Sequence, residues 1–386
     1  MKKFQKIMSY LVVAVLSSML TLTIGFQSAE SPKVSKLEQL EQLILERFIG
    51  EEDKIAMEDA AAEAMVAALG DRWSYYIPAA EYSDYVDQMN NSYVGVGITI
   101  QVTEDSQGFL VTKVTEGGPA DQAGMLPGDR IVAVDGTDVR QMDVNETSAL
   151  VKGEENTQVQ ITVDRAGLEL TLTVTRMLVQ TPVATAKMLP GGVGLITIAN
   201  FDTRCAEETI AAMDKLLAEG ARKLIFDVRF NPGGYVHELV KVLDYILPEG
   251  ELFRAVDYKG NEDVDTSDAK CLTGIPMAVL VNADSYSAAE FFAAALREYD
   301  YAIVVGEATT GKGYFQQTFN LQDGSAVGLS VGKYFTPQGK SLAEEGGLVP
   351  DVVIAVEEET ALGIYAGSLD PLEDPQIKAA IEALNP

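Results

Sequence analysis

The chain has 386 residues, of which 47% are hydrophobic and 8% aromatic, so it is long enough for two or three domains with ordinary cores. Acidic residues outnumber basic ones by 58 to 29, and a net charge of −29 repels nucleic acid and anionic lipid. With one histidine, His237, and two well-separated cysteines, Cys205 and Cys271, the chain cannot build the usual zinc sites. We therefore expect no metal and no nucleic-acid partner. The cysteine spacing leaves open whether the two form a disulfide.

The N-terminus has the features of an export signal. Lys2, Lys3 and Lys6 precede an apolar stretch, residues 8–26, which is about long enough to span a bilayer. A clear cleavage site does not follow, so an uncleaved signal anchor is favoured over a cleaved signal peptide for residues 1–29. Either interpretation places the rest of the chain outside the cytoplasm, anchored to the membrane or secreted.

Three further segments differ in their apolar pattern. Residues 30–92 contain two stretches with apolar residues at helical spacing, which predict an N-terminal helical segment. Residues 93–178 alternate like short strands separated by tight turns, which is typical of a small β domain. In residues 179–386 strands and helices alternate, so we expect a mixed α/β fold for the chain as a whole.

The sequence GGPADQAGMLPGDRIVAVDG, at 117–136, resembles the centre of bacterial PDZ domains. Such domains bind the C-terminal tails of proteins by adding a strand to a sheet edge, and backbone amides hold the terminal carboxylate. The resemblance implies that the carboxylate-binding loop is formed by Gly95, Val96, Gly97 and Ile98. The alternative is that these glycines only turn the chain.

Several motifs that suggest other chemistry lack the context they need. Residues 306–312 match the start of a phosphate-binding loop, but Gly313 replaces the hydroxyl residue and a hairpin is predicted where a helix is required. Ser267 and Lys270 have the spacing of penicillin-binding enzymes but lie in a polar stretch. His237 is predicted near the start of a helix, where a lone histidine is usually a polar surface or packing residue. We therefore expect no nucleotide at residues 306–312, and we expect neither Ser267 with Lys270 nor His237 to be catalytic.

Ser287 is the strongest candidate nucleophile. It stands where a predicted strand ends and a helix begins, so helix amides can stabilise negative charge that develops beside it. The alternative is structural, because Ser287 and Glu290 have the spacing of a capping box. With histidine nearly absent, lysine is the natural base. Lys312 follows the next predicted strand, and a lysine loses its proton when it is buried.

Residues 281–317, VNADSYSAAEFFAAALREYDYAIVVGEATTGKGYFQQ, resemble the active-site stretch of the C-terminal processing peptidases, also called tail-specific proteases. The resemblance implies that Ser287 is the nucleophile, that Lys312 is the general base and that Gln316 orients the lysine. DVRFNPGGYV, at 227–236, resembles a second motif of the family. It implies an oxyanion hole formed by the amides of Gly233, Gly234 and Ala288.

The family resemblance covers roughly residues 36–386 and sets the remaining expectations. It implies a ClpP/crotonase-like protease core with an inserted PDZ domain, and it allows for a homodimer. It also implies an extracytoplasmic serine endopeptidase that needs no cofactor and cleaves protein substrates whose C-terminal tails the PDZ domain captures. The alternative is a catalytically inactive PDZ scaffold that binds tails. A catalytic role for Glu298 ranks lower, because the end of its helix is expected to be solvated.

Overall fold

The computed structural model describes residues 35–103 and 107–385, so the predicted signal anchor or signal peptide lies outside the described residues. The chain divides into two compact units, residues 1–62 and 63–386. Among the described residues, no helix has the length and apolar character needed to cross a membrane.

The first unit contains two of the predicted helices. Helix α2 (Lys36–Arg47) begins at a capping box in which the Glu38 amide donates to Ser35 Oγ at 3.1 Å. Helix α3 (Lys54–Ala67) starts in this unit and ends in the second. The helical periodicity of these stretches therefore predicted their secondary structure correctly.

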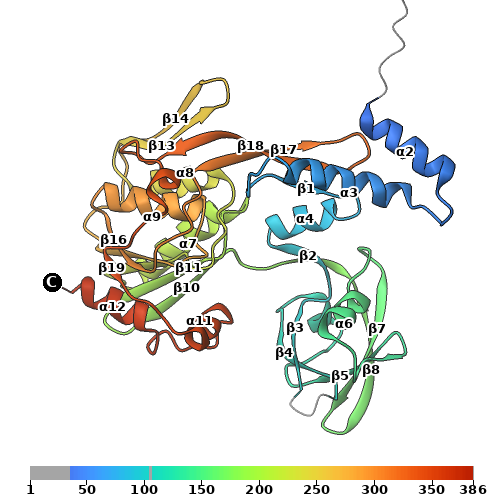
Figure 1. Cartoon of the computed structure of the whole chain (residues 1–386). Coiled ribbons are helices and arrows are strands. Elements are labelled where there is room, and N and C mark those ends of the chain that lie inside the picture. The colour runs from blue at the N-terminus through green and yellow to red at the C-terminus, as the bar shows by residue number, and fades with distance from the viewer. Residues whose placement is uncertain (1–34, 104–106, 386) are drawn as a thin grey trace, which may run out of the picture. The chain divides into compact units, whose positions relative to one another are not determined.

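The second unit contains a six-stranded sheet, which is parallel except where its first two strands pair (Figure 1). In spatial order the strands are β10 (Ala184–Leu189), β11 (Val193–Ile198), β12 (Lys223–Asp227), β15 (Met277–Val281), β16 (Ala302–Gly306) and β19 (Val352–Val353). This arrangement confirms the predicted alternation of strands and helices.

Helices cover both faces of this sheet. Along β15, the side chains of Met277, Val279 and Val281 join one apolar cluster, and those of Ala278 and Leu280 join another, because successive side chains of a strand point to opposite faces. The first cluster includes residues of α7 (Cys205–Ala218), α8 (Val236–Ile246) and α9 (Ala288–Glu298), and the second includes residues of α12 (Pro375–Ala383). Burial on both faces explains the continuous apolar run of β15.

A second sheet lies within the same unit and carries residues that follow the predicted base. Its strand order is β1-β18-β13-β14, and β17 pairs with β18. The bounds are β1 (Tyr75–Ile77), β13 (Gly250–Asp257), β14 (Glu262–Ser267), β17 (Tyr314–Asn320) and β18 (Ala326–Phe335). The segment after Lys312 is thus the predicted hairpin, β17 and β18, rather than the helix that a phosphate-binding loop requires.

The segment predicted as the PDZ domain forms a third sheet, of order β3-β4-β5-β7-β8, with β6 paired to β5. Its strands are β3 (Ile98–Val102), β4 (Phe109–Val114), β5 (Arg130–Val134), β6 (Thr137–Asp138), β7 (Gln158–Arg165) and β8 (Leu168–Thr175). Two short helices, α5 (Pro119–Gln122) and α6 (Val144–Val151), complete it, and its core is a separate cluster of buried residues. Strands β2 (Ser92–Gly95) and β9 (Met177–Gln180) pair where the chain enters and leaves the segment.

The structure shows the state of the two cysteines and the positions of Ser267 and His237. Both Cys205 and Cys271 are free thiols. Ser267 ends strand β14, so Ser267 and Lys270 do not share the helix that their motif requires. His237 lies in the first turn of α8 with a 59% exposed side chain. That neither Ser267 nor His237 is catalytic stays a prediction.

The expectation for Glu298 was wrong. Its side chain is 3% exposed rather than solvated. The carboxylate accepts hydrogen bonds from Thr336 Oγ1 and the Gln338 amide, both at 2.9 Å, because the turn after β18 folds over the end of α9. Glu298 is therefore buried because its carboxylate holds this turn against the end of α9.

Candidate active site

Ser287 lies at a strained turn between β15 and α9. Its φ of 58° falls in the left-handed region, which residues other than glycine adopt at a cost of order 1–3 kcal/mol and which is common at functional sites. Neighbouring contacts fix the turn. Ser285 Oγ donates to the Val228 carbonyl at 2.7 Å, and the Phe230 amide donates to Asn282 Oδ1 at 2.9 Å. Strain of this kind is more than a helix cap needs.

The hydroxyl of Ser287 contacts a tyrosine. Ser287 Oγ and the Tyr334 hydroxyl, from β18, lie 2.9 Å apart. The Tyr334 ring is fixed by contacts with other aromatic rings, among them Phe291 at 4.6 Å and Phe253 at 5.4 Å between centroids. Burial raises the pKa of Tyr334 far above its ordinary value, so the phenol is neutral at physiological pH.

Lys312 follows β16, which pairs in parallel with β15, so the lysine and Ser287 emerge at the same edge of the sheet. Burial lowers the pKa of Lys312 from its ordinary value of 10.5 to about 8, while the charges of Glu290 and Asp71 act in the opposite direction. At pH 7 roughly one molecule in ten then carries a neutral amine. Lys312 Nζ lies 4.8 Å from the centre of the Trp73 ring.

Glu290 connects the two candidate residues through their backbones. Its buried carboxylate accepts hydrogen bonds from the backbone amides of Ser287 (2.9 Å), Gly311 (2.7 Å) and Lys312 (2.9 Å), and from the hydroxyl of Thr309 (2.5 Å). The amides that a phosphate-binding loop would offer to a nucleotide thus hold a carboxylate of the protein itself. The sequence indicated Glu290 only as a capping partner. The signal that could have revealed more is an acidic residue inside the apolar run AAEFFAAAL.

Gly233, which together with Gly234 precedes α8, lies directly against the predicted nucleophile. A Cβ added to Gly233 would stand 2.7 Å from Ser287 Cβ and 2.9 Å from the Ala288 amide nitrogen, so a larger residue does not fit. The Gly233 amide donates to Asn231 Oδ1 at 2.8 Å, which engages one of the three amides predicted for the oxyanion hole. Gly234 forms a parallel bridge with Phe201.

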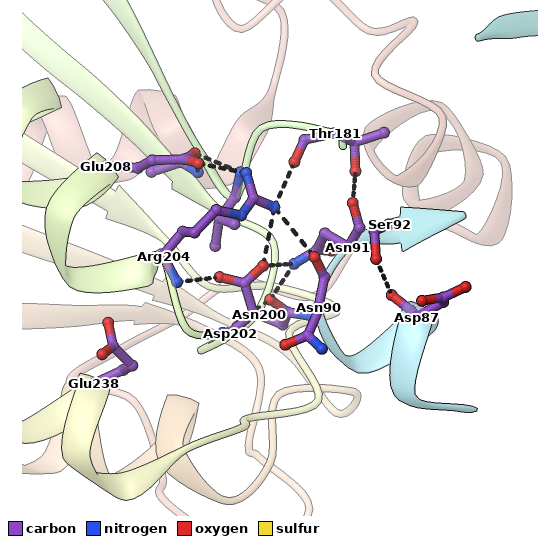
Figure 2. Close-up of polar contacts among 12 residues, drawn as sticks. Asp87, Asn90, Asn91, Ser92, Thr181, Asn200, Asp202, Arg204, Glu208 and Glu238 are labelled. Carbon is purple, nitrogen blue, oxygen red and sulfur yellow. Dashed lines mark hydrogen bonds and ion pairs between the residues drawn. The ribbon is translucent and has the colours of Figure 1, made fainter. Parts of the chain in front are cut away.

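A cluster of polar residues around Arg204 lies close to the chain on both sides of the PDZ segment (Figure 2). The guanidinium of Arg204 donates to the carbonyls of Asn90 (3.2 Å) and Thr181 (3.0 Å), and it pairs with Asp202 and Glu208 at 3.0 and 2.6 Å. Asn90 lies two residues before β2 and Thr181 follows β9, so Arg204 ties the entry and exit of the PDZ segment to the protease core. The sequence analysis did not identify this cluster.

Backbone hydrogen bonds connect the same cluster to the segment that contains Gly233 and Gly234. Phe201 lies next to Asp202, its amide donates to the Gly233 carbonyl at 2.7 Å, and its carbonyl accepts the Tyr235 amide at 2.7 Å. The backbone of residues 200–202 therefore braces the segment predicted as the oxyanion hole.

Gln316 lies on β17 at the wall of a cavity of about 940 Å³ that Ser287, Lys312, Gly233 and Gly234 also line. Its side-chain amide donates to Ser330 Oγ at 3.0 Å and to the Tyr314 carbonyl at 3.2 Å. The fold thus brings the predicted nucleophile, base and orienting residue to one cavity.

The predicted carboxylate-binding loop lies between β2 and β3. Gly95 ends β2 and Ile98 begins β3, while Val96 is buried. Gly97 has a φ of 76°, and its carbonyl accepts the Thr115 amide at 2.9 Å. Strand β3 stands at one end of its sheet, which leaves an edge to which a peptide can add.

Comparisons with known proteins agree with these observations. Residues 192–354 match the model of peptidase family S41, and residues 110–165 match a PDZ domain. The carboxy-terminal processing protease CtpA of Bacillus subtilis is 32% identical over 347 residues, which cover 87% of this chain and 74% of that protein. A carboxyl-terminal-processing protease of Synechocystis is 32% identical over 84% of this chain and 76% of its own length.

Solved structures extend the likeness to the fold. A crystal structure of a candidate S41 protease from Bacteroides fragilis has a TM-score of 0.54 with this chain, at 16% identity, and covers 90% of this chain and 96% of its own. The relatives of 32% identity confirm the family that the sequence motifs implied, and the likeness to the solved structure confirms the mixed α/β fold. The chain is a serine-type peptidase of family S41 that carries a PDZ domain.

Proposed function

We propose that the protein cleaves polypeptides near their C-termini with a Ser-Lys dyad formed by Ser287 and Lys312. The observation that carries the proposal is that one cavity is lined both by a serine in a strained turn and by a partly buried lysine whose pKa is lowered to about 8. A lysine in such a position can accept a proton near neutral pH.

In the proposed reaction, Ser287 Oγ turns from Tyr334 toward the substrate and attacks the carbonyl carbon of the scissile peptide bond. The hydroxyl proton passes to Lys312 Nζ. The oxyanion is stabilised by the amides of Gly234 and Ala288, since an N-terminal helix amide and a neighbouring glycine amide suit developing negative charge.

Collapse of the tetrahedral intermediate breaks the carbon–nitrogen bond. Lys312 gives its proton to the leaving amine, and Ser287 is left as an acyl ester. A water molecule then attacks the ester and passes a proton to Lys312, which returns it to Ser287 as the new carboxyl group leaves. Gln316 keeps the lysine in place in this scheme, and Glu290 fixes the backbones of both residues.

The PDZ domain would capture the substrate's tail at the edge of β3, with the amides of residues 95–98 toward the terminal carboxylate. The free edge of β3 and the buried turn at Val96 and Gly97 support this assignment. The apolar segment 8–26 would anchor the protein, with its catalytic part outside the cytoplasm.

The decisive test uses the full chain and unstructured polypeptides with varied C-termini. We expect cleavage by the wild type, and binding without cleavage by Ser287→Ala. We expect Lys312→Arg to bind but not cleave, since arginine keeps the charge and cannot act as a base. An amidated C-terminus should weaken binding to all three proteins equally. Cleavage by Ser287→Ala at the wild-type rate would refute the dyad, and loss of the nucleophile should otherwise cost many orders of magnitude in rate.

A further inference from the structure

The environment of the Lys312 amine is aromatic. Lys312 Nζ lies 4.8 Å from the centroid of the Trp73 ring and 5.8 Å from that of Tyr286. The two rings lie 5.7 Å apart and are tilted by 35°. The amine therefore stands against two ring systems at once, which is the arrangement of a small aromatic cage.

The segment that supplies Trp73 is fastened to the sheet that carries Gln316. Ser74 Oγ donates to Asp71 Oδ2 at 2.6 Å and accepts the Ser330 amide at 3.1 Å. Ser330 Oγ in turn accepts the Gln316 side-chain amide at 3.0 Å. The indole is thus held over Lys312 by a chain of hydrogen bonds that ends at the predicted orienting residue.

The second ring of the cage belongs to the turn of the nucleophile. Tyr286 immediately precedes Ser287, and its amide donates to the Asn231 carbonyl at 3.1 Å. A lysine held against Tyr286 is consequently held next to the turn that presents Ser287. This geometry gives the cage a second effect besides the exclusion of water, because it sets where the amine stands.

We propose that Trp73 is a positioning residue that holds the Lys312 amine, shielded from water, against Tyr286 at the turn of the nucleophile. The inference rests on the proposed role of Lys312 as the base. Trp73 acts on the amine in two opposing ways. Its indole displaces water, which favours the neutral amine, and its π-face attracts the ammonium, which favours the charged one.

Other charged and titratable groups lie around the cage, and the variant Lys312→Met distinguishes their titration from that of the lysine. Glu290 faces Lys312 from α9 and Asp71 from the segment before β1. Burial raises the pKa of Glu290. At Asp71, burial is outweighed by hydrogen bonds with Ser330 and Ser74, which lower the pKa. Arg72 stacks on Trp73 at 4.2 Å and stays charged. Burial raises the pKa of Tyr286 above its ordinary value of 10.0. The carboxylates of Asp257, Glu262, Asp263 and Asp265 line the same cavity.

Trp73 is the only tryptophan of the chain, so its fluorescence reports on this site alone. A positive charge beside an indole shifts its emission. We expect the emission of the full-length protein to titrate with a midpoint near 8, the value expected for Lys312. Lys312→Met should abolish the transition. Lys259→Met is the matched control, because Lys259 lies 5.1 Å from the Tyr258 ring in another cation–π pair, and it should keep the transition.

An identical titration in Lys312→Met, or a flat curve for the wild type, would overturn the proposal. The measurement needs no substrate, so it stays interpretable even if the protein cleaves nothing. Failure of the proposed function and failure of this inference therefore give different results.

Activity supplies a second readout. Trp73→Ala opens the cage to water, so the acidic limb of the pH–kcat/KM profile should move to higher pH, with a loss of about tenfold at pH 7 for each unit. Trp73→Phe keeps a ring over the amine and should stay near the wild type. A uniform loss at every pH in Trp73→Ala would indicate a merely structural role and contradict the proposal. If Trp73→Ala does not fold, the fluorescence titration decides.

Discussion

Replacing Lys312 by methionine should abolish activity and at the same time stabilise the fold. A lysine whose pKa falls from 10.5 to about 8 on folding destabilises the native state by roughly 3 kcal/mol at pH 7. The lost cation–π contacts with Trp73 and Tyr286 offset about 1 kcal/mol of the gain. Methionine has a similar length and no charge, so Lys312→Met should be more stable than the wild type by about 2 kcal/mol.

The pH dependence follows from the direction of the shift. Because the folded pKa is lower than the unfolded one, the unfolded chain binds more protons between pH 8 and 10.5, and wild-type stability rises across this window. The destabilisation is full below about pH 8 and disappears above about 10.5. The advantage of Lys312→Met should therefore shrink from pH 8 upward.

Urea unfolding at pH 7 and pH 9.5, followed by Trp73 fluorescence, measures the difference. Lys259→Met serves as the control, because its exposed lysine should leave stability unchanged at both values. If Lys312→Met is less stable than the wild type at pH 7, or if its advantage does not depend on pH, the lysine is not held in a dry environment and the reasoning fails.

Four further substitutions test the surroundings of the dyad. Tyr334→Phe should keep kcat within about tenfold of the wild-type value, because the neutral phenol only forms a hydrogen bond with the serine hydroxyl. A loss of kcat as large as that of Ser287→Ala would instead assign Tyr334 a part in proton transfer. Glu290→Gln places a side-chain amide, itself a donor, among four hydrogen-bond donors. The free energy of unfolding in urea should fall by about 2 kcal/mol and kcat at least tenfold. An unchanged kcat would contradict the proposal that Glu290 fixes the two backbones. Gly233→Ala should reduce kcat/KM by about a hundredfold, since its Cβ collides with the serine, and wild-type kinetics would exclude the close approach. Arg204→Met should lower the free energy of unfolding by about 2 kcal/mol and speed hydrogen exchange at the Tyr235 amide. Unchanged exchange would show that the polar cluster does not stabilise the backbone around Gly233 and Gly234.

The placement of Ser287 and Lys312 was predictable because it depends on local patterns. Two apolar stretches, each followed by polar or glycine-rich residues, indicate neighbouring parallel strands, and the carboxyl ends of such strands meet at one edge of the sheet. The family motifs then assigned the roles of the two residues. The hairpin after Lys312 followed from the alternation of its side chains.

Contacts between distant segments could not be predicted in this way. Tyr334, which contacts Ser287, lies 47 residues later in the sequence. Trp73, which contacts Lys312, lies before the PDZ segment in the sequence, whereas Lys312 lies after it. Periodicity indicates which face of a strand is buried and does not indicate which side chain it meets. Glu298 shows the opposite error, because its charge suggested solvent while a turn from β18 covers it.

The carboxylate of Glu290 makes the loop of residues 309–312 independent of any anion from solution. Four donors that would otherwise attract phosphate, sulfate or a nucleotide are already saturated by a buried group of the chain. Dissolved ions screen charges on the surface far more than pairs inside the protein. Turnover should consequently tolerate high ionic strength and phosphate buffers even where the acidic exterior, and with it the encounter with charged substrates, responds to salt.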